Sequence, residues 1–312
     1  MNYISNPVAS FPKNSITIDI FGNAFYRNYA FGAGDDTGVY WNDKIEYSAE
    51  AMIFFSMAME KTLSGKYSYG KKLRSSQSHN FKMKLPVKDG KIDFDFMESF
   101  IAELEAERVA ELSAYLTVSG YDNYELSAEE LDALRSFETL DWKAFNLEVL
   151  FGKSTRGKRL KSFDRIEGKL PFVTAGEADE GVSAFIGNEV EVFESNTTTI
   201  DMFGSAKYRN YKYGADDHIA VVHTEKVPMK ASIFLTSSIH KAAHTGKFDY
   251  GHNFYAKDAD ALDIMLPVKN SQPDYDVMQL LISAVQKLVI KDVVLYSDAK
   301  IAATKTVVSS KV

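Results

Sequence analysis

The sequence has no cysteine among its 312 residues. This excludes a disulfide framework, thiol catalysis and cysteine-ligated zinc sites. No apolar run approaches the roughly 18 residues that a membrane-spanning helix needs, and the first residues lack the basic and then apolar stretch of a signal peptide. We therefore expect a cytoplasmic protein that has no membrane partner.

The motifs that mark common enzyme families are absent as well. There is no phosphate-binding Walker sequence, no nucleophile elbow of the GxSxG type and no glycine-rich loop for a methyltransferase cofactor. The strings "DIFG" and "DMFG" look like the kinase Asp-Phe-Gly motif, but the kinase glycine loop and catalytic loop do not accompany them. We expect no catalytic residue in this chain and no cofactor bound by it.

The composition indicates folded domains whose charge is unevenly distributed. With 45% hydrophobic and 13% aromatic residues, the chain is expected to fold, and its length suits about two domains. A net charge of −7 argues weakly against binding to nucleic acid. Many of the acidic residues lie in one predicted helix, "MESFIAELEAERVAELSAY", so a basic face elsewhere is compatible with the overall balance.

The chain carries one unusual string twice. Residues 14–32 and 196–214 share twelve identities in nineteen gap-free positions, including "TIDIFGNAFYRNY" against "TIDMFGSAKYRNY". One extra residue near Gly34 is expected to change the offset from 182 to 181, after which "GKYSYG" matches "GKFDYG" and "KLPVK" matches "MLPVK". A period near 180 residues is too long for a solenoid repeat and indicates a duplicated domain.

The two copies are unequal in length. The stretch 142–185 has no counterpart in the first copy, because "ISNP" at 4–7 aligns with "IGNE" at 186–189. We therefore expect a truncated first domain, either because the chain is a fragment or because this domain is reduced. The lost strands would leave an unpaired sheet edge.

Two patterns could bind a metal ion. His240 and His244 have the i, i+4 spacing of a zinc-binding pair, but the metalloprotease glutamate is absent. Their predicted counterparts, Met59 and Leu63, indicate a packed helix face instead. The segment 164–169, "DRIEGK", faintly resembles a metal-dependent nuclease, although its carboxylates are too close for a motif that spans two strands. We expect no metal site, and a nuclease is the least favoured hypothesis.

Short β-branched and aromatic stretches bounded by Gly, Asn and Asp predict sheets in both copies. The expected strands are Ser15–Ile20, Phe81–Val87, Leu170–Val173, Val190–Phe193, Thr198–Met202, Ile219–His223 and Leu262–Val268. In the repeated string, Gly22 and Gly204 are expected to be turn glycines and Ile18 and Ile200 core residues. Structural roles are also favoured for Asp19 and Asp201.

Helices are expected over Ala49–Leu63 and Met229–His244, each closed by a glycine, Gly65 or Gly246. Longer helices follow over Asp95–Leu116 and Asp276–Tyr296. Their apolar residues recur at three- and four-residue spacing, as in a seam between two packed helices; they are Met97, Ile101 and Leu104, then Met278, Ile282, Val285 and Val289. Ser127 and Glu130 have capping-box spacing and predict a linker helix that ends before Trp142.

The sequence thus predicts an α+β fold with two sheet-rich domains, each followed by a long helix. The expected boundaries are 1–94 for the partial first domain, 95–141 for its long helix and the linker helix, 142–274 for the second domain, and 275–312 for the C-terminal helix and tail. Each long helix alone would expose its apolar seam, so the two are expected to pair with each other.

Basic and aromatic residues are interleaved in several segments, which suits a phosphate backbone with bases beside it. The stretch "GKSTRGKRLKSFDR" contributes Arg156, Lys158 and Arg159, and the repeated strings contribute Tyr26, Arg27, Lys66 and Tyr69 in the first copy and Lys207, Tyr208, Arg209, Lys247 and Tyr250 in the second. We expect these residues to form the DNA-binding surface. Ordinary solvated loops would give the same charge pattern.

The order of these motifs resembles the DNA specificity (S) subunits of type I restriction-modification systems. The strings "ITIDIFGNAFYRNY", "TIDMFGSAKYRNY", "GKLPFVTAGEADEGVSAFIGN" and "HTGKFDYGHNF" resemble the target-recognition domains of this family, and look closest to the version found in type IIB specificity subunits. The resemblance covers nearly the whole chain.

The resemblance implies that each target-recognition domain reads one half of a bipartite site in double-stranded DNA. It also implies that the long helices form an antiparallel coiled coil that sets the distance between half-sites. The partners would be methyltransferase (M) subunits, which bind S-adenosylmethionine, and a restriction (R) subunit that joins through them. Positions where the copies differ, such as Phe25 against Lys207 and Ser68 against Asp249, would then carry differences in specificity. The alternative is a remnant that binds methyltransferase subunits through its helices without reading DNA.

Overall fold

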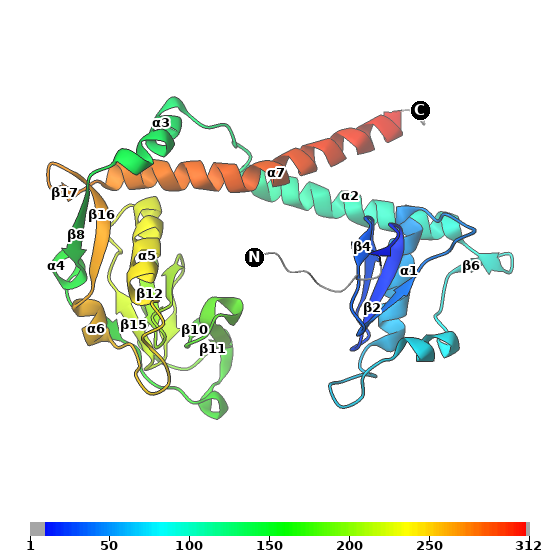
Figure 1. The fold of residues 1–312 in the computed structure, drawn as a ribbon, viewed down its shortest axis with the longest axis horizontal. Coiled ribbons are helices and arrows are strands. Elements are labelled where there is room, and N and C mark those ends of the chain that lie inside the picture. Colours follow the sequence, from blue (N-terminus) through cyan, green and yellow to red (C-terminus); the bar gives the residue numbers. More distant parts are fainter. Residues whose placement is uncertain (1–9, 310–312) are drawn as a thin grey trace. The chain divides into compact units, whose positions relative to one another are not determined.

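The computed structural model describes residues 10–309 and has an α+β fold (Figure 1). The chain divides into two compact units. Unit 1 is made of two segments, the chain up to Gly120 and the chain from Val293 onward. Unit 2 comprises Tyr121–Asp292. Helix α7 (Tyr275–Ser309) contributes to both units. In the described residues, no helix has the length and the apolar character needed to cross a membrane.

Unit 1 is built on a three-stranded antiparallel sheet with the order β3-β2-β5. Helix α1 (Ala49–Leu63) packs against it, and α2 (Phe94–Val118) follows. Its strands are β2 (Ser15–Asp19), β3 (Ala24–Arg27) and β5 (Thr37–Tyr40), with the short pairs β1 (Ser10–Phe11) and β4 (Phe31–Gly32), and β6 (Val87–Lys88) and β7 (Lys91–Ile92); η1 (Ser75–Asn80) is a 3-10 turn. The core gathers Ile16 and Ile18 from the central strand with Met52, Phe55 and Leu63 from α1.

Unit 2 contains three sheets, with the orders β13-β12-β15-β9, β11-β10-β14 and β17-β16-β8. Their strands are β8 (Trp142–Asn146), β9 (Thr155–Arg156), β10 (Glu167–Val173), β11 (Val182–Ile186), β12 (Thr197–Asp201), β13 (Ala206–Arg209), β14 (Gly214–Ala215), β15 (Ile219–Val222), β16 (Asp263–Lys269) and β17 (Gln272–Pro273). The helices are α3 (Ala128–Ser136), α4 (Leu147–Phe151), α5 (Met229–Ala243) and α6 (Ala256–Asp260), with 3-10 turns η2 (Phe137–Thr139), η3 (Ser162–Asp164) and η4 (Ala178–Gly181).

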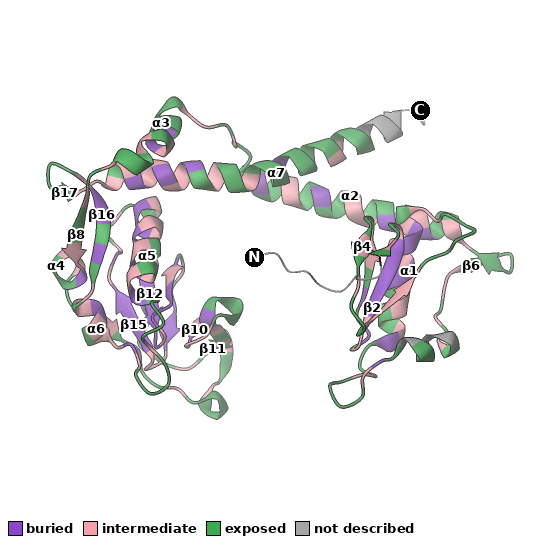
Figure 2. Cartoon of the chain, viewed as in Figure 1, coloured by how far each residue is buried: buried purple, intermediate pink, exposed green. Residues whose placement is uncertain are grey.

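The stretch that the first copy lacks supplies a strand to every sheet of unit 2. Strands β8, β9 and β10 lie within residues 142–185, and β11 ends one residue later. The β12–β15 core of this unit is buried on both faces (Figure 2). In the described residues of unit 1, β2 keeps the equivalent neighbours β3 and β5, but no strand takes the place of β9, so β5 is an edge strand.

The predicted strand Phe81–Val87 is wrong. Only Val87 is in a strand, as part of the short pair β6–β7. The matching segment of unit 2 forms β16, which pairs along its length with β8, from Asp263 opposite Asn146 to Pro267 opposite Trp142. The described residues of the first copy include no counterpart of β8, so this segment has no ladder partner there, although Phe81, Met83 and Leu85 still pack on the core.

The predicted strand Val190–Phe193 is also wrong. Among these residues only Phe193 makes a ladder contact, an isolated bridge to Tyr213, on whose ring it stacks at 5.6 Å between centroids. The other expected strands are confirmed as β2, β10, β12, β15 and β16, with ends that differ by at most three residues.

The predicted helices are confirmed, and α7 extends well beyond its expected end at Tyr296. Ser127 and Glu130 form the predicted capping box at the start of α3. Within unit 1, Lys300 Nζ of α7 donates to Glu105 Oε1 of α2 at 2.6 Å. Of the expected seam, Met97, Ile101 and Met278 are buried, whereas Val289 is 73% exposed. A continuous antiparallel coiled coil stays a prediction.

The register of the two copies differs from the sequence alignment. Thr17 pairs with Val39, and Thr199 with Val221, so the offset is still 182 beyond Gly34. In the helices the equivalent contacts are 180 residues apart, because the amide of Ala24 donates to Glu60 and that of Ala206 to His240. The counterpart of His240 is therefore Glu60 and not Met59.

Candidate functional site

The repeated string forms the same hairpin in each unit, β2–β3 and β12–β13. Asp201 Oδ1 closes its turn by accepting from the amides of Phe203 at 2.9 Å and Ser205 at 3.0 Å. Asp19 does the same for Phe21 and Asn23, both at 2.9 Å. Burial alone would raise the pKa of Asp19, but these hydrogen bonds outweigh it and lower the pKa. The predicted structural roles of both aspartates are confirmed.

The turn glycines are required by backbone conformation and by space. Gly204 has φ of 82° and Gly22 has φ of 91°, in the left-handed region that side chains disfavour. A Cβ on Gly204 would lie 2.5 Å from the carbonyl oxygen of Ala243, and one on Gly22 would lie 2.8 Å from Leu63 Cβ. The hairpin turn therefore lies directly against the end of the helix in each unit.

The tyrosines of the string hold the hairpin to the chain segment before the helix. The hydroxyl of Tyr208 donates to Asn196 Oδ1 at 3.0 Å, and that of Tyr26 to Asn14 Oδ1 at 3.1 Å. The Asn196 amide in turn donates to the carbonyl of Val227 at 2.7 Å. Burial raises the pKa of Tyr208. These contacts give both tyrosines a structural role, and their predicted contact with DNA stays a prediction.

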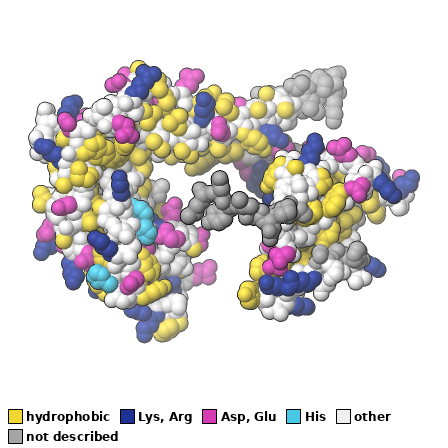
Figure 3. Space-filling view, viewed as in Figure 1, with side chains coloured by type: hydrophobic (Ala, Val, Ile, Leu, Met, Phe, Trp, Pro, Cys, Tyr) yellow, Lys and Arg dark blue, Asp and Glu magenta, His cyan; other side chains and the backbone are white. Residues whose placement is uncertain are grey.

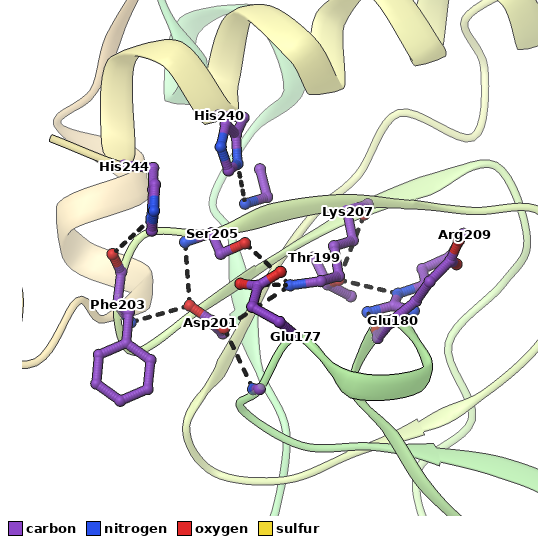
Figure 4. A network of polar contacts seen from close by, with 12 residues as sticks. Glu177, Glu180, Thr199, Asp201, Phe203, Ser205, Lys207, Arg209, His240 and His244 are labelled. Carbon is purple, nitrogen blue, oxygen red and sulfur yellow. Dashed lines mark hydrogen bonds and ion pairs between the residues drawn. The ribbon is translucent and has the colours of Figure 1, made fainter. Parts of the chain in front are cut away.

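Arg209 is a core residue, which corrects its prediction as a surface contact. It is only 1% exposed. Its Nε donates to Thr199 Oγ1 at 3.0 Å and one terminal nitrogen to the Glu180 carbonyl at 2.8 Å (Figure 4). The other terminal nitrogen donates to the Tyr211 hydroxyl at 3.0 Å. Its guanidinium is bonded through all three of its nitrogens inside unit 2 and does not reach the surface.

Arg27, at the same position in unit 1, is half-buried. It keeps the equivalent bonds, with Nε donating to Thr17 Oγ1 at 3.1 Å and a terminal nitrogen to the Tyr29 hydroxyl at 3.4 Å. Its guanidinium lies 5.2 Å from the centroid of Phe25. No third partner is recorded for it in the described part of the chain, so Arg27 remains a candidate contact.

Lys207 lies in a polar network and not on an open basic surface (Figure 4). Its Nζ donates to Ser205 Oγ at 2.9 Å and lies 3.3 Å from Glu177 Oε1 and 3.9 Å from Asp201 Oδ2. The Lys207 side chain is only 14% exposed. Two carboxylates balance its charge, and its predicted contact with DNA stays a prediction.

Glu177 is a residue that sequence reasoning missed. Its side chain is 71% exposed, and hydrogen bonding to Ser205 and the charge of Lys207 lower its pKa, so it presents an ionised carboxylate. It comes from the stretch without a counterpart in the first copy, and no motif singled it out. A carboxylate held in this way can accept a hydrogen bond from a base amino group.

The two histidines are accounted for by packing. His240 Nδ1 accepts from the Ala206 amide at 3.1 Å, His244 Nδ1 lies 3.2 Å from the Phe203 carbonyl, and the two rings stack at 4.7 Å (Figure 4). In the described residues, the group whose ligand atoms could surround a metal ion is Asp216, Asp217 and His218. Asp217 already pairs with Arg156 at 3.3 Å, so its charge is compensated.

The loops that follow α1 and α5 carry the most exposed of the predicted contacts. Tyr69 is 83% exposed and Tyr250 is 85% exposed, and Lys66 and Lys247 in the same loops are exposed too. Each loop lies at the end of its helix that is remote from α2 or α7 (Figure 1). Lysine and arginine side chains lie at this end of each unit, and others are spread over the rest of its surface (Figure 3).

The predicted basic stretch is also at the surface. Lys158 and Arg159 are exposed, and neither makes an ion pair among the described residues. Arg156 is half-exposed but pairs with Asp217, and its guanidinium lies 5.7 Å from the centroid of Tyr255. Lys158 and Arg159 are therefore better placed than Arg156 to meet a phosphate.

Unit 1 has two further cations that were not predicted. Lys72 and Arg74 follow Tyr69 and pair with Asp36 at 3.5 and 3.1 Å. The run "KKLR" at 71–74 was the signal for them. Arg74 occupies the position of Tyr255 in unit 2, because Leu73 and Phe254 make equivalent backbone bonds to Ile20 and Met202.

The chain is similar to known DNA specificity proteins of restriction-modification systems. A type I restriction modification DNA specificity domain matches residues 4–114. The specificity subunit S.BcgI of a type II restriction enzyme from Heyndrickxia coagulans is 23% identical over 240 residues, which cover 76% of this chain and 67% of that protein. These findings confirm the resemblance predicted from the repeated strings.

Solved structures of two S subunits are similar at low identity. The S subunit of a type I restriction-modification system from M. genitalium has 14% identity and a TM-score of 0.47, covering 96% of this chain and 82% of that one. The HsdS subunit from Thermoanaerobacter tengcongensis has 12% identity and a TM-score of 0.34, covering 93% and 76%.

Proposed function

Because this chain is related to the DNA specificity subunits of restriction-modification systems, we propose that it is the non-catalytic subunit that reads DNA for such a complex. Each unit reads one half of a bipartite site in double-stranded DNA. The chain directs methyltransferase subunits, and through them a restriction subunit, to that site. S-adenosylmethionine belongs to the methyltransferase partner in this proposal.

One observation carries the proposal: two units of one chain present the same exposed groups at equivalent positions. Lys66 and Tyr69 follow the helix of unit 1 as Lys247 and Tyr250 follow that of unit 2. Two copies of one reading surface on a single chain suit a site made of two half-sites, because the half-site spacing then follows from protein geometry.

The exposed residues divide into two physical roles. Lys66, Lys247, Lys158 and Arg159 are suited to phosphates, which fix the register of a protein on a duplex but carry no sequence information. Sequence is read by groups that reach base edges. The copies differ in such groups, since Lys207 and its partner Glu177 in unit 2 are matched by Phe25 alone in unit 1.

The second candidate function is a remnant that occupies methyltransferase subunits without reading DNA. In the described residues of unit 1, no strand takes the place of β9 and the segment that matches β16 has no ladder partner, which favours this candidate. The two candidates differ in salt dependence. A DNA reader loses affinity steeply as salt rises, because its cations displace counterions from the duplex.

The test is to co-express the chain with the methyltransferase subunit of its own system and to map methylated adenines by single-molecule sequencing. An asymmetric bipartite motif supports reading by both units. A symmetric motif built from one repeated half-site means that unit 2 reads and that two chains combine. A stable complex that methylates nothing contradicts DNA reading and leaves the remnant.

A further inference from the structure

Tyr69 and Tyr250 are exposed aromatic rings that lie outside the hydrophobic cores. At 83% and 85% exposure they belong to none of the hydrophobic clusters, unlike the half-buried aromatic residues next to them, Tyr67 and Phe248. A large ring that is left in water at the same position of both copies points to a binding role.

Each tyrosine is the first central residue of a two-residue turn. In unit 1 the Ser68 amide donates to the Lys71 carbonyl at 3.2 Å, and the Lys71 amide donates to the Ser68 carbonyl at 2.9 Å. In unit 2 the Asp249 amide donates to the His252 carbonyl at 3.0 Å, and the His252 amide donates to the Asp249 carbonyl at 3.2 Å. The two turns therefore present their rings from the same closed backbone, with a glycine as the second central residue.

The surroundings of the two rings differ while their exposure does not. Tyr250 contacts Phe203 edge to face at 5.3 Å, whereas Lys72 Nζ lies 5.3 Å from the centroid of Tyr69. Lys66 and Lys247 lie in the same loops. Asp249 Oδ1 is turned back into its own turn, where it accepts from the amides of Gly251 at 2.7 Å and His252 at 2.9 Å.

On these grounds we infer that Tyr69 and Tyr250 act as paired aromatic wedges, each stacking against a base step of one half-site. The inference rests on the proposed function and adds a contact mode to it. A ring on a closed turn loses little conformational freedom on binding, and every base has a face on which it can stack. The flanking lysines favour a polyanion as the partner over an apolar protein surface.

The experiment uses the complex with the methyltransferase subunit and a duplex that carries its mapped methylation site. 2-Aminopurine, whose fluorescence rises when it is unstacked, replaces a base at successive positions of each half-site. The variants are Tyr250→Ala, Tyr250→Phe, Tyr69→Ala and Tyr69→Phe. The matched control is Val149→Ala, which alters another apolar side chain that is 83% exposed but lies in α4.

We expect the alanine variants to bind about 10-fold to 100-fold more weakly, which is the range of one base–aromatic stack. Each should lose the fluorescence rise in its own half-site only. The phenylalanine variants and Val149→Ala should behave as the unaltered chain, because the phenyl ring keeps the stacking face.

Three results would overturn the inference. If the complex binds its site but Tyr→Ala changes neither affinity nor fluorescence, the wedge is wrong and DNA reading stands. If Tyr→Ala instead abolishes co-elution with the methyltransferase subunit, the tyrosines face a protein partner. If the unaltered complex binds no duplex at all, the proposed function itself fails, and the wedge fails with it.

Discussion

The two copies of the repeated string differ most at their arginine. Arg209 and Arg27 bond to the same pair of side chains, a threonine on the neighbouring strand and a tyrosine two residues on. Among the described residues only Arg209 of the two has a third hydrogen-bond partner, the carbonyl of Glu180, and only Arg209 is buried. The repeated string therefore forms the same hydrogen bonds within itself in both units. Whether its arginine is buried depends on a separate segment, which supplies Glu180 in unit 2.

The same lesson applies to the segment "LPVK". Residues 85–88 and 266–269 share it, yet only the second is part of a long strand. Backbone amides and carbonyls need partners, and β8 supplies them in unit 2 alone.

The largest effect is expected for Arg209→Ala. It should lower the free energy of unfolding of unit 2 by about 3–5 kcal/mol, because it empties a buried site and leaves Thr199, Tyr211 and Glu180 without their donor. Arg27→Ala should lower the free energy of unfolding of unit 1 by about 1 kcal/mol or less, since water can take the place of its half-buried guanidinium. Urea denaturation measures both, with Trp142 reporting on unit 2 and Trp41 on unit 1.

Single-tryptophan versions, Trp41→Phe and Trp142→Phe, isolate the two signals, because the chain has only 2 tryptophans. Arg209→Lys is the control that keeps the charge but not the three-way hydrogen bonding. Equal losses for Arg209→Ala and Arg27→Ala would contradict the assigned difference in burial.

The next effect is expected at the turn glycines. Gly204→Ala should destabilise unit 2 by about 3 kcal/mol, because the new Cβ combines a positive φ with a backbone oxygen 2.5 Å away. Gly22→Ala should cost unit 1 about 1–2 kcal/mol, since its closest neighbour is a side-chain atom at 2.8 Å. Thermal melts followed by the same tryptophans rank the two, and a larger loss for Gly22→Ala would be evidence against this order.

A smaller effect is expected for the ion pairs that α7 makes in each unit. In unit 2, Lys287 Nζ lies 2.9 Å from Glu130, whose side chain is only 6% exposed. In unit 1, Lys300 and Glu105 are 41% and 42% exposed. Glu130→Gln should cost about 2 kcal/mol because it leaves a charge unpaired in the protein, and Glu105→Gln about 0.5 kcal/mol or less.

The Glu130 pair also predicts a dependence on pH. Burial pushes the pKa of Glu130 upward, but hydrogen bonds from Ser127, Ser283 and Lys287 outweigh it and lower the pKa from 4.5 to about 2. The pair therefore stabilises unit 2 fully above pH 4.5, and its contribution is lost as the pH falls from 4.5 towards 2. Denaturation over this range should show a slope that Glu130→Gln reduces, and an unchanged slope would count against the pair.

The smallest effect is expected for single lysines on the binding loops. Lys247→Ala and Lys66→Ala should each weaken DNA binding less than about tenfold and reduce the slope of log affinity against log salt by about 1. Equal changes would mean that both units contact phosphates. A change for Lys247→Ala alone would mean that unit 2 carries the binding, and no change in either slope would remove these loops from the interface.

Much of the fold could be predicted because its signals are local. The repeat located the duplicated hairpins, the capping box located α3, and helix periodicity located α1, α2 and α5. The candidate site was less predictable. The exposure of Tyr69 and Tyr250 follows from a turn that the sequence marks with glycine, but the balanced charge of Lys207 depends on Glu177, which comes from another part of the chain.

By itself the sequence determined the duplication, the turns that Asp19 and Asp201 close, and the glycines with positive φ, because these depend on residues a few positions apart. Only the tertiary structure decided that Arg209 is buried, that "LPVK" pairs in one unit, and that Glu60 and not Met59 matches His240. A hydrogen-bond partner or a covering segment from a distant part of the chain sets each of these, and no local pattern encodes where such a partner will lie.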